Sequence, residues 1–210
     1  MRSISLADYR RGQGLTPSDW SEAERLAWYD RLATEGAADA LVRSATWRAL
    51  VPLLGRPVPD LLERLLFAVR AVAPFRPDAF DADGWRAPRV TFVEGGDCED
   101  LATLLVAMTR AAREIYQLPV YARLVWIKQP GRALDHVTAE LAASDEALDE
   151  TPVVVSVDGE IAPRAPWVWA EASVPGAALG EDPYAALVRA RALVKAEDVL
   201  GRALAPGGGA

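Results

Sequence analysis

The stretch GGDCEDLATLL, residues 95–105, is the most informative part of this chain. It places a pair of glycines before an acidic turn, and the turn before an apolar pattern with the spacing of an amphipathic helix. Cys98, the single cysteine of the chain, lies at the predicted start of that helix. We therefore expect a helix that is capped by Asp97 and carries the thiol in its first turn.

The surroundings of Cys98 are typical of a nucleophilic thiol. A cysteine attacks as its thiolate, and the partial positive charge of a helix N-terminus lowers the pKa of a thiol placed there. The glycines allow a sharp bend and leave space for a substrate, and the N–H of Cys98 can stabilise an oxyanion. The carboxylates of Asp97, Glu99 and Asp100 oppose this, because they raise the pKa of the thiol unless they point away or are paired.

The single histidine, His136, lies in the strand-like segment LDHVTAEL, residues 134–141. Strand alternation places it on the more polar face, as a general base near solvent requires. A later strand-like segment, WVWAEAS at residues 167–173, carries Glu171. If the two segments pair, Glu171 can accept a hydrogen bond from the imidazole and orient it, as the third member of a catalytic triad does.

The remaining pattern predicts an α+β fold in which helices precede a mainly antiparallel sheet. A capping signal at 16–19 is expected to start the first helix. The expected order is helices over 20–33, 37–54 and 60–72, an extended connector over 75–94, the cysteine helix, strands over 120–127, 134–141, 151–159 and 167–173, and a helix over 183–204. We divide the chain into a helical extension at 1–56, a main domain at 57–205 and a flexible tail at 206–210.

Charge and composition exclude several classes of function. The net charge of −7 argues against nucleic acid as a partner, because phosphate binding needs a basic surface. Neither a signal peptide nor an apolar run of about 18 residues is present, so we expect a cytoplasmic protein without a membrane partner. One cysteine and one histidine are too few for an ordinary zinc site, and Asp78, Asp81 and Asp83 lack the spacing of a calcium loop. Neither a metal nor a cofactor is expected.

The same residues resemble a known family. GGDCEDLATLL is similar to the G-D-C-E-D-x-A-x-L-L signature of the transglutaminase-like cysteine hydrolases, which share a papain-like core. DHVTAEL resembles the strand with the family's catalytic histidine, and WVWAEAS resembles its W-x-x-x-D-P-T strand, with glutamate in place of aspartate. The resemblance covers residues 60–185 and implies an antiparallel sheet packed on the cysteine helix.

The resemblance also implies acyl transfer on an amide bond of a protein or peptide substrate. It makes Cys98 the nucleophile, His136 the general base and Glu171 the orienting acid. Trp85 is the candidate for an aromatic residue that helps to form the oxyanion hole. A thioester on Cys98 can go to water or to an amine, and hydrolysis is favoured because the sequence marks no site for a second amine.

Several alternatives stay open. Asp158 or Glu140 can take the place of Glu171, because glutamate is longer than the aspartate of the family. Cys98 can also be a small buried residue of a catalytically silent scaffold or assembly protein, with its N-terminal helices against a partner, even within a phage-like particle. Rapid alkylation of Cys98 below about pH 7 would favour the enzyme over the scaffold. Redox sensing ranks last, because the chain has no second cysteine to resolve an oxidised thiol.

Overall fold

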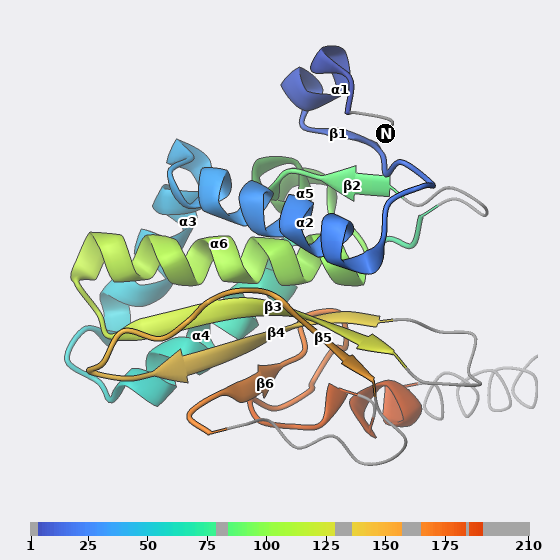
Figure 1. Cartoon of the computed structure of the whole chain (residues 1–210). Helices are drawn as coiled ribbons and strands as arrows, with labels where there is room; N and C mark the ends of the chain where they lie inside the picture. Colours follow the sequence, from blue (N-terminus) through green and yellow to red (C-terminus); the bar gives the residue numbers. More distant parts are fainter. Residues whose placement is uncertain (1–3, 79–83, 129–135, 157–164, 184, 191–210) are drawn as a thin grey trace, which may run out of the picture.

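The protein has a mixed α+β architecture with two sheets, built around the long helix α6 (Cys98–Tyr116), as Figure 1 shows. The computed structural model describes residues 4–78, 84–128, 136–156, 165–183 and 185–190. Helices α2 and α3 lie on one side of α6, and a four-stranded sheet lies on the other. The other elements are α1 (Leu6–Arg11), β1 (Gln13–Leu15), α2 (Glu22–Ala37), α3 (Ala40–Leu50), the 3₁₀ turn η1 (Val51–Leu53), α4 (Val58–Val72), β2 (Gly84–Arg86), α5 (Pro88–Glu94), β3 (Val120–Lys128), β4 (His136–Ala143), β5 (Val153–Ser156) and β6 (Val168–Ala170).

Helix α6 is buried on all sides over most of its length. Every residue from Glu99 to Ala112 is buried, although the sequence pattern predicts a single apolar stripe. The reason is the position of α6 between two layers, since a helix that packs against neighbours on both sides has no solvent face. The first turn of α6, with Cys98, is therefore held rigidly between the helices and the sheet.

The main sheet brings the predicted histidine and glutamate strands together. Its strand order is β5-β3-β4-β6, and β4 pairs with both β3 and β6 in antiparallel fashion. The prediction of a mainly antiparallel sheet is confirmed, with the parallel pair β3–β5 as an addition. Both faces of β4 are buried from His136 to Ala142. The expected position of His136 near solvent is therefore wrong, because elements cover both faces of this strand.

Local capping explains where the helices differ from prediction. Helix α2 begins after Ser21, which forms a capping box with Glu24, rather than at the signal in 16–19. Asp39 caps α3 through its side chain, so α3 begins at Ala40 rather than at residue 37, and it ends at Leu50 before the 3₁₀ turn η1. Helix α5 replaces part of the predicted extended connector. It is short and begins with Pro88 in its first turn, where proline is tolerated.

The helices before and after residue 56 share one hydrophobic core. One cluster combines Leu26 of α2 and Leu50 of α3 with Leu65 of α4, Leu105 of α6 and residues of the sheet. Residues 183 and 185–190 are helical, whereas the tail at 206–210 and the rest of the predicted last helix lie outside the described residues. Within the described part of the chain, no helix combines the length and the apolar character needed to cross a membrane.

Candidate functional site

The glycines before Cys98 make room for the chain itself. Gly95 has φ 82° and ψ −175°, and a Cβ at this position would lie 2.1 Å from the carbonyl oxygen of Pro74. A Cβ on Gly96 would lie 2.4 Å from the Cβ of Asp100. The nitrogen of Arg76 donates to the oxygen of Gly96 at 2.8 Å, which ties the connector to the turn. The space that we predicted for a substrate is thus filled by the connector and by Asp100.

Cys98 lies in the first turn of α6, as predicted, and its side chain is half-buried. Its Sγ donates to Oε2 of Glu99 at 3.2 Å. The backbone of Val137, the residue after His136, forms a hydrogen bond with the sulfur. Asp97 occupies the N-cap position, but its side chain makes no capping hydrogen bond, contrary to the prediction. The structure therefore brings the thiol to the backbone near the beginning of β4, at the residue after the histidine.

His136 and Glu171 form the predicted pair. Nε2 of the imidazole donates to Oε2 of Glu171, and both side chains are buried. Oε1 of Glu171 accepts from the nitrogen of Ser173 at 2.8 Å and from its hydroxyl at 2.6 Å. Arg70 of α4 donates to the backbone oxygen of Glu171 and, at 2.6 Å, to that of Ala177. The carboxylate is thus held from the side opposite the imidazole.

These contacts keep Glu171 ionised. Burial raises the pKa of its carboxyl, but the charge and hydrogen bond of His136, together with the hydrogen bonds from Ser173, outweigh burial. The net result is a lowered pKa for Glu171. A permanent negative charge at Oε2 stabilises a positive charge on the imidazole, which is what an orienting acid supplies.

The surroundings of the thiol have the opposite effect. Burial raises the pKa of Cys98 well above its usual value, and the negative charges of Glu99 and Asp97 raise it further. The hydrogen bond from Val137 lowers the pKa but does not compensate. The net effect is a raised pKa, because burial first and the neighbouring carboxylates second outweigh the lowering expected from the helix N-terminus.

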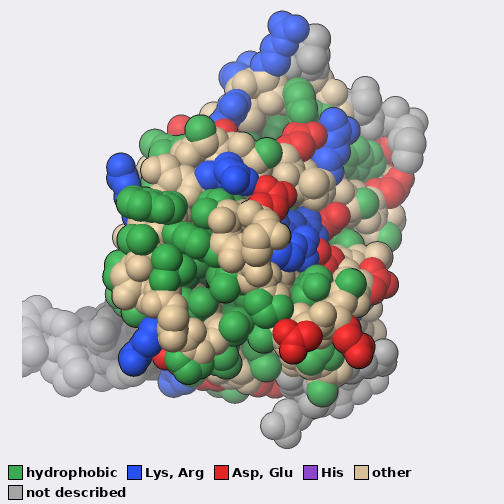
Figure 2. Space-filling view, turned by 90° about the vertical axis from the view of Figure 1, so that its left-hand side faces the viewer, with side chains coloured by type: hydrophobic (Ala, Val, Ile, Leu, Met, Phe, Trp, Pro, Cys, Tyr) green, Lys and Arg blue, Asp and Glu red, His purple; other side chains and the backbone are tan. Residues whose placement is uncertain are grey.

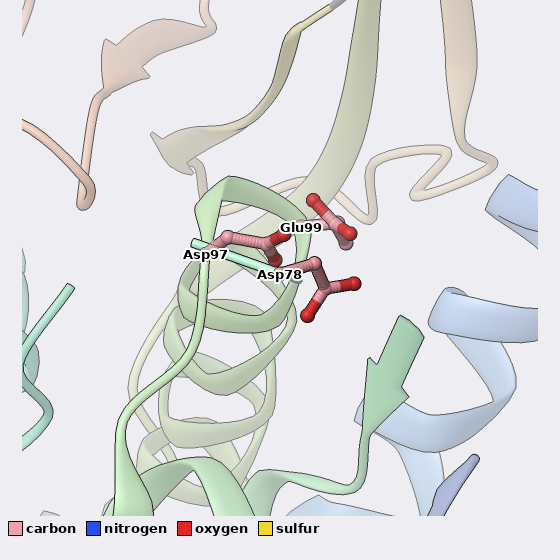
Figure 3. A group of neighbouring side chains, drawn as sticks. All are labelled: Asp78, Asp97 and Glu99. Carbon is pink, nitrogen blue, oxygen red and sulfur yellow. The ribbon is translucent and has the colours of Figure 1, made fainter. Parts of the chain in front are cut away.

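A group of three carboxylates gathers at the first turn of α6 (Figure 3). One oxygen each of Asp78, Asp97 and Glu99 lies within 4.8 Å of the others. The neighbouring Asp100 is paired, since Arg86 donates to it from its backbone nitrogen at 2.7 Å and from its guanidinium. Arg86 also reaches Asp78 at 3.2 Å. Arg86 thus pairs with two of these carboxylates, Asp100 and Asp78.

Burial changes the protonation of these carboxylates. It raises the pKa of Asp97 to about 6 and that of Asp100 to about 7, in both cases against the charge of Arg86. The pKa of Glu99 is raised well above its usual value, by burial first and then by the charges of Asp97 and Asp100. The hydrogen bond between Asp97 and Glu99 lowers the pKa of Asp97 and raises that of Glu99.

Oxygen ligands in this arrangement are the type that hard divalent cations prefer, so Asp78, Asp97 and Glu99 are the residues that could hold such a metal. This group was not predicted from the sequence, where Asp78 was considered only as part of a calcium loop with Asp81 and Asp83. Asp81 and Asp83 lie outside the described residues. The grouping depends on the position of the connector against α6, and neighbouring positions in the sequence carry no signal for it.

Replacing Asp97 by asparagine is expected to stabilise the protein by about 1–2 kcal/mol at pH 7 but not at pH 4. A carboxyl group whose pKa rises from 3.8 to about 6 on folding binds protons more tightly in the folded state. Its contribution to stability is therefore present below pH 4 and lost as the pH rises through 6. No capping bond is lost, because the Asp97 side chain makes none.

Urea unfolding of the wild type and the asparagine variant between pH 4 and pH 7 measures this difference. Asp145, an exposed aspartate, is the matched control, and Asp145→Asn should leave the pH dependence unchanged. A stability difference between wild type and Asp97→Asn that is the same at every pH would contradict the prediction.

The remaining candidates lie elsewhere. Trp85 is buried in the core, where its ring meets that of Trp28 edge-on at 5.1 Å. None of the contacts found for Trp85 in the described residues joins it to Cys98, so its role in an oxyanion hole stays a prediction without a supporting contact. Glu140 binds Arg123 at 2.6 Å, and Asp158 lies outside the described residues. Of the three acids considered, Glu171 is the one found on the imidazole.

Sequence reasoning missed two residues that hold Glu171. Ser173 follows it by two positions, and a hydroxyl at that spacing is a signal that could have been noticed, because it can bond a preceding carboxylate. The contact of Arg70 could not be predicted in this way, because Arg70 lies in α4, far from Glu171 in the sequence.

No family model matches the chain, and neither a curated protein nor a solved structure shows a significant similarity to it. The chemistry of the site is therefore inferred from its geometry and from the residues that compose it.

Proposed function

We propose that the protein is a thiol hydrolase of the transglutaminase-like type, which cleaves an amide bond of a protein or peptide by acyl transfer through Cys98. The observation that carries this proposal is the buried pair of His136 and Glu171 at the start of the strand whose next residue, Val137, bonds the sulfur of Cys98. The α+β layers, with an antiparallel sheet against the cysteine helix, agree with the papain-like core that the resemblance implies.

The reaction begins with proton transfer from the thiol to the imidazole. Because Glu171 occupies Nε2 of His136, Nδ1 is the nitrogen that can accept the proton. The sulfur attacks the amide carbonyl, and the C–N bond breaks as the imidazolium returns the proton to the leaving amine. Water then attacks the thioester and gives a proton to His136. The imidazolium protonates the departing sulfur, which releases a carboxylic acid and restores the thiol.

The raised pKa of Cys98 determines how the first step proceeds. A thiol whose pKa lies well above its usual value is not stored as a thiolate, so a base must remove its proton during the attack. The ionised Glu171 supports this transfer by stabilising the imidazolium.

A second function has a specific observation in its favour. The thiol donates to Glu99 and its pKa is raised, which is the state of an inert buried cysteine rather than of an activated one. A catalytically silent scaffold would keep the same fold and the same hydrogen bonds. Slow alkylation below pH 7 is now expected for both functions, so it no longer distinguishes them.

The test is the hydrolysis of a library of internally quenched peptides, followed by acid quenching and intact-mass measurement. The enzyme is expected to show an added acyl mass on Cys98, the single cysteine, and the Cys98→Ala variant should show neither that mass nor product. Cleavage that persists in Cys98→Ala would exclude the thiol mechanism. Failure to cleave any peptide, together with an equal alkylation rate of Cys98 in wild type and His136→Ala, would establish the scaffold instead.

A further inference from the structure

An open groove lies between α3 and α4, away from the thiol. It has a volume of about 290 Å³, and Phe92 of α5 and the buried Met108 of α6 also line it. Small side chains from the two helices line its middle, namely Ser44, Ala45 and Ala49 of α3 and Ala68 and Ala71 of α4. The lining positions recur at three and four residues on each helix, so each helix presents one continuous face to the groove.

Large apolar side chains stand exposed along this groove. Phe67 of α4 is 57% exposed, Leu41 of α3 is 40% exposed and Val72 of α4 is 39% exposed. Figure 2 shows hydrophobic side chains gathered over the α3 side of the molecule, with basic side chains among them. Helix α4 already buries Leu61, Leu65 and Val69 in the core, so its exposed residues form a second apolar face. An apolar face of this kind marks an interaction site.

The charge of the groove is opposite to that of the protein. Arg48 and Arg64 line it, and none of the described lining residues carries a carboxylate. Within the described ranges, no ion pair is found for either arginine. Arg64 donates to the backbone oxygen of Ala49 at 3.3 Å and lies 5.2 Å from the ring centre of Phe67, which holds its charge at the groove. The chain as a whole has a net charge of −7, so the groove is a local site of positive charge on an acidic protein.

We propose that this groove binds an amphipathic helix of a partner protein, with an apolar face toward Phe67 and Leu41 and acidic residues toward Arg48 and Arg64. The groove follows each helix for about 12 Å, a little more than two helical turns. A partner helix of that length presents apolar side chains at positions i, i+3 or i+4, and i+7, which is the usual pattern for a helix bound in a groove. Glutamates beside that face would pair with the two arginines and set the direction of the helix.

The experiment uses two fluorescent stapled peptides of about four helical turns. Both carry leucine at i, i+3, i+4 and i+7, and the flanking positions are glutamate in one peptide and lysine in the other. Fluorescence anisotropy with the full chain at low ionic strength is expected to show the acidic peptide binding at least about tenfold more tightly than the basic one. Phe67→Ala and Arg48→Glu should each weaken the acidic peptide by about tenfold.

Phe67 and Arg48 are exposed, so replacing them should leave the fold intact. Arg10→Glu on α1, also at an exposed position, is the matched charge control and should leave binding unchanged. The proposal is overturned if the acidic peptide shows no saturable binding up to about 1 mM, if both peptides bind equally, or if Phe67→Ala has no effect. Sedimentation equilibrium tests whether a second copy of the chain occupies the groove instead. A dimer of the wild type that dissociates in Phe67→Ala would assign the groove to a second copy of the chain and would also overturn the proposal.

Discussion

Replacing Glu171 by glutamine is expected to slow Cys98-dependent hydrolysis by roughly 10²- to 10⁴-fold. The carboxylate is ionised, buried and bonded to Nε2 of His136, so it compensates the positive charge that the imidazole acquires when it takes the thiol proton. Glutamine keeps the size of the side chain and removes the charge. It also offers an N–H where the imidazole requires an acceptor, which disfavours the tautomer with a proton on Nε2.

The matched control is Glu140→Gln. Glu140 is also a buried glutamate and lies in β4, the strand of His136, but it binds Arg123 rather than the imidazole. Steady-state hydrolysis of one peptide substrate should therefore change by less than about threefold in Glu140→Gln, provided that circular dichroism shows an intact fold. Equal losses in the two variants would mean that Glu171 supports the sheet rather than the chemistry. A larger loss in Glu140→Gln would move the role of the orienting acid to Glu140.

Replacing Gly95 by alanine is expected to lower the free energy of unfolding by about 2–5 kcal/mol, because two costs add. The first is conformational, since φ 82° with ψ −175° is a combination that residues other than glycine rarely adopt. The second is steric, because the new Cβ would lie 2.1 Å from the carbonyl oxygen of Pro74. Backbone atoms cannot rotate away as a flexible side chain can, so the connector must move.

Urea unfolding of Gly95→Ala and Gly55→Ala separates the two costs. Gly55 also has a positive φ, 89°, but a Cβ there would meet nothing within 4 Å. Gly55→Ala is therefore expected to lose only about 1–2 kcal/mol from the backbone conformation. If both variants lose the same amount, the close approach of the connector to the glycine turn contributes nothing to stability and does not explain the need for glycine at position 95.

Local pattern was sufficient to predict the elements that carry the candidate site. The helix from Cys98 follows from its apolar spacing and from the glycines before it. The strand with His136 and the strand β6, which ends at Ala170 just before Glu171, follow from alternation. These signals extend over a few neighbouring residues, so a single sequence contains them. The shortest helices and strands could not be predicted from such patterns. Helix α5 and the paired strands β1 and β2 are too short for periodicity to emerge, and contacts with the rest of the fold stabilise them.

The state of the thiol could not be predicted in the same way. The sequence shows Asp97, Glu99 and Asp100 beside Cys98, but not which of them a cation neutralises. In the fold, Arg86 pairs with Asp100, while Asp97 and Glu99 remain close to the sulfur and raise its pKa. Burial has the largest effect on that pKa, and burial depends on the layers that enclose α6.

The sequence by itself determined that the one cysteine begins a helix, that the one histidine lies in a strand, and that a glutamate lies at the end of a strand able to pair with it. Helix and strand periodicity depend on neighbouring residues, so these features can be predicted from a single sequence. Only the tertiary structure decided that Glu171 bonds His136, that Asp78 joins the carboxylates near the thiol, and that α3 and α4 enclose an apolar groove. Charge, burial and shape at those places come from segments that are far apart in the sequence and meet only when the core packs.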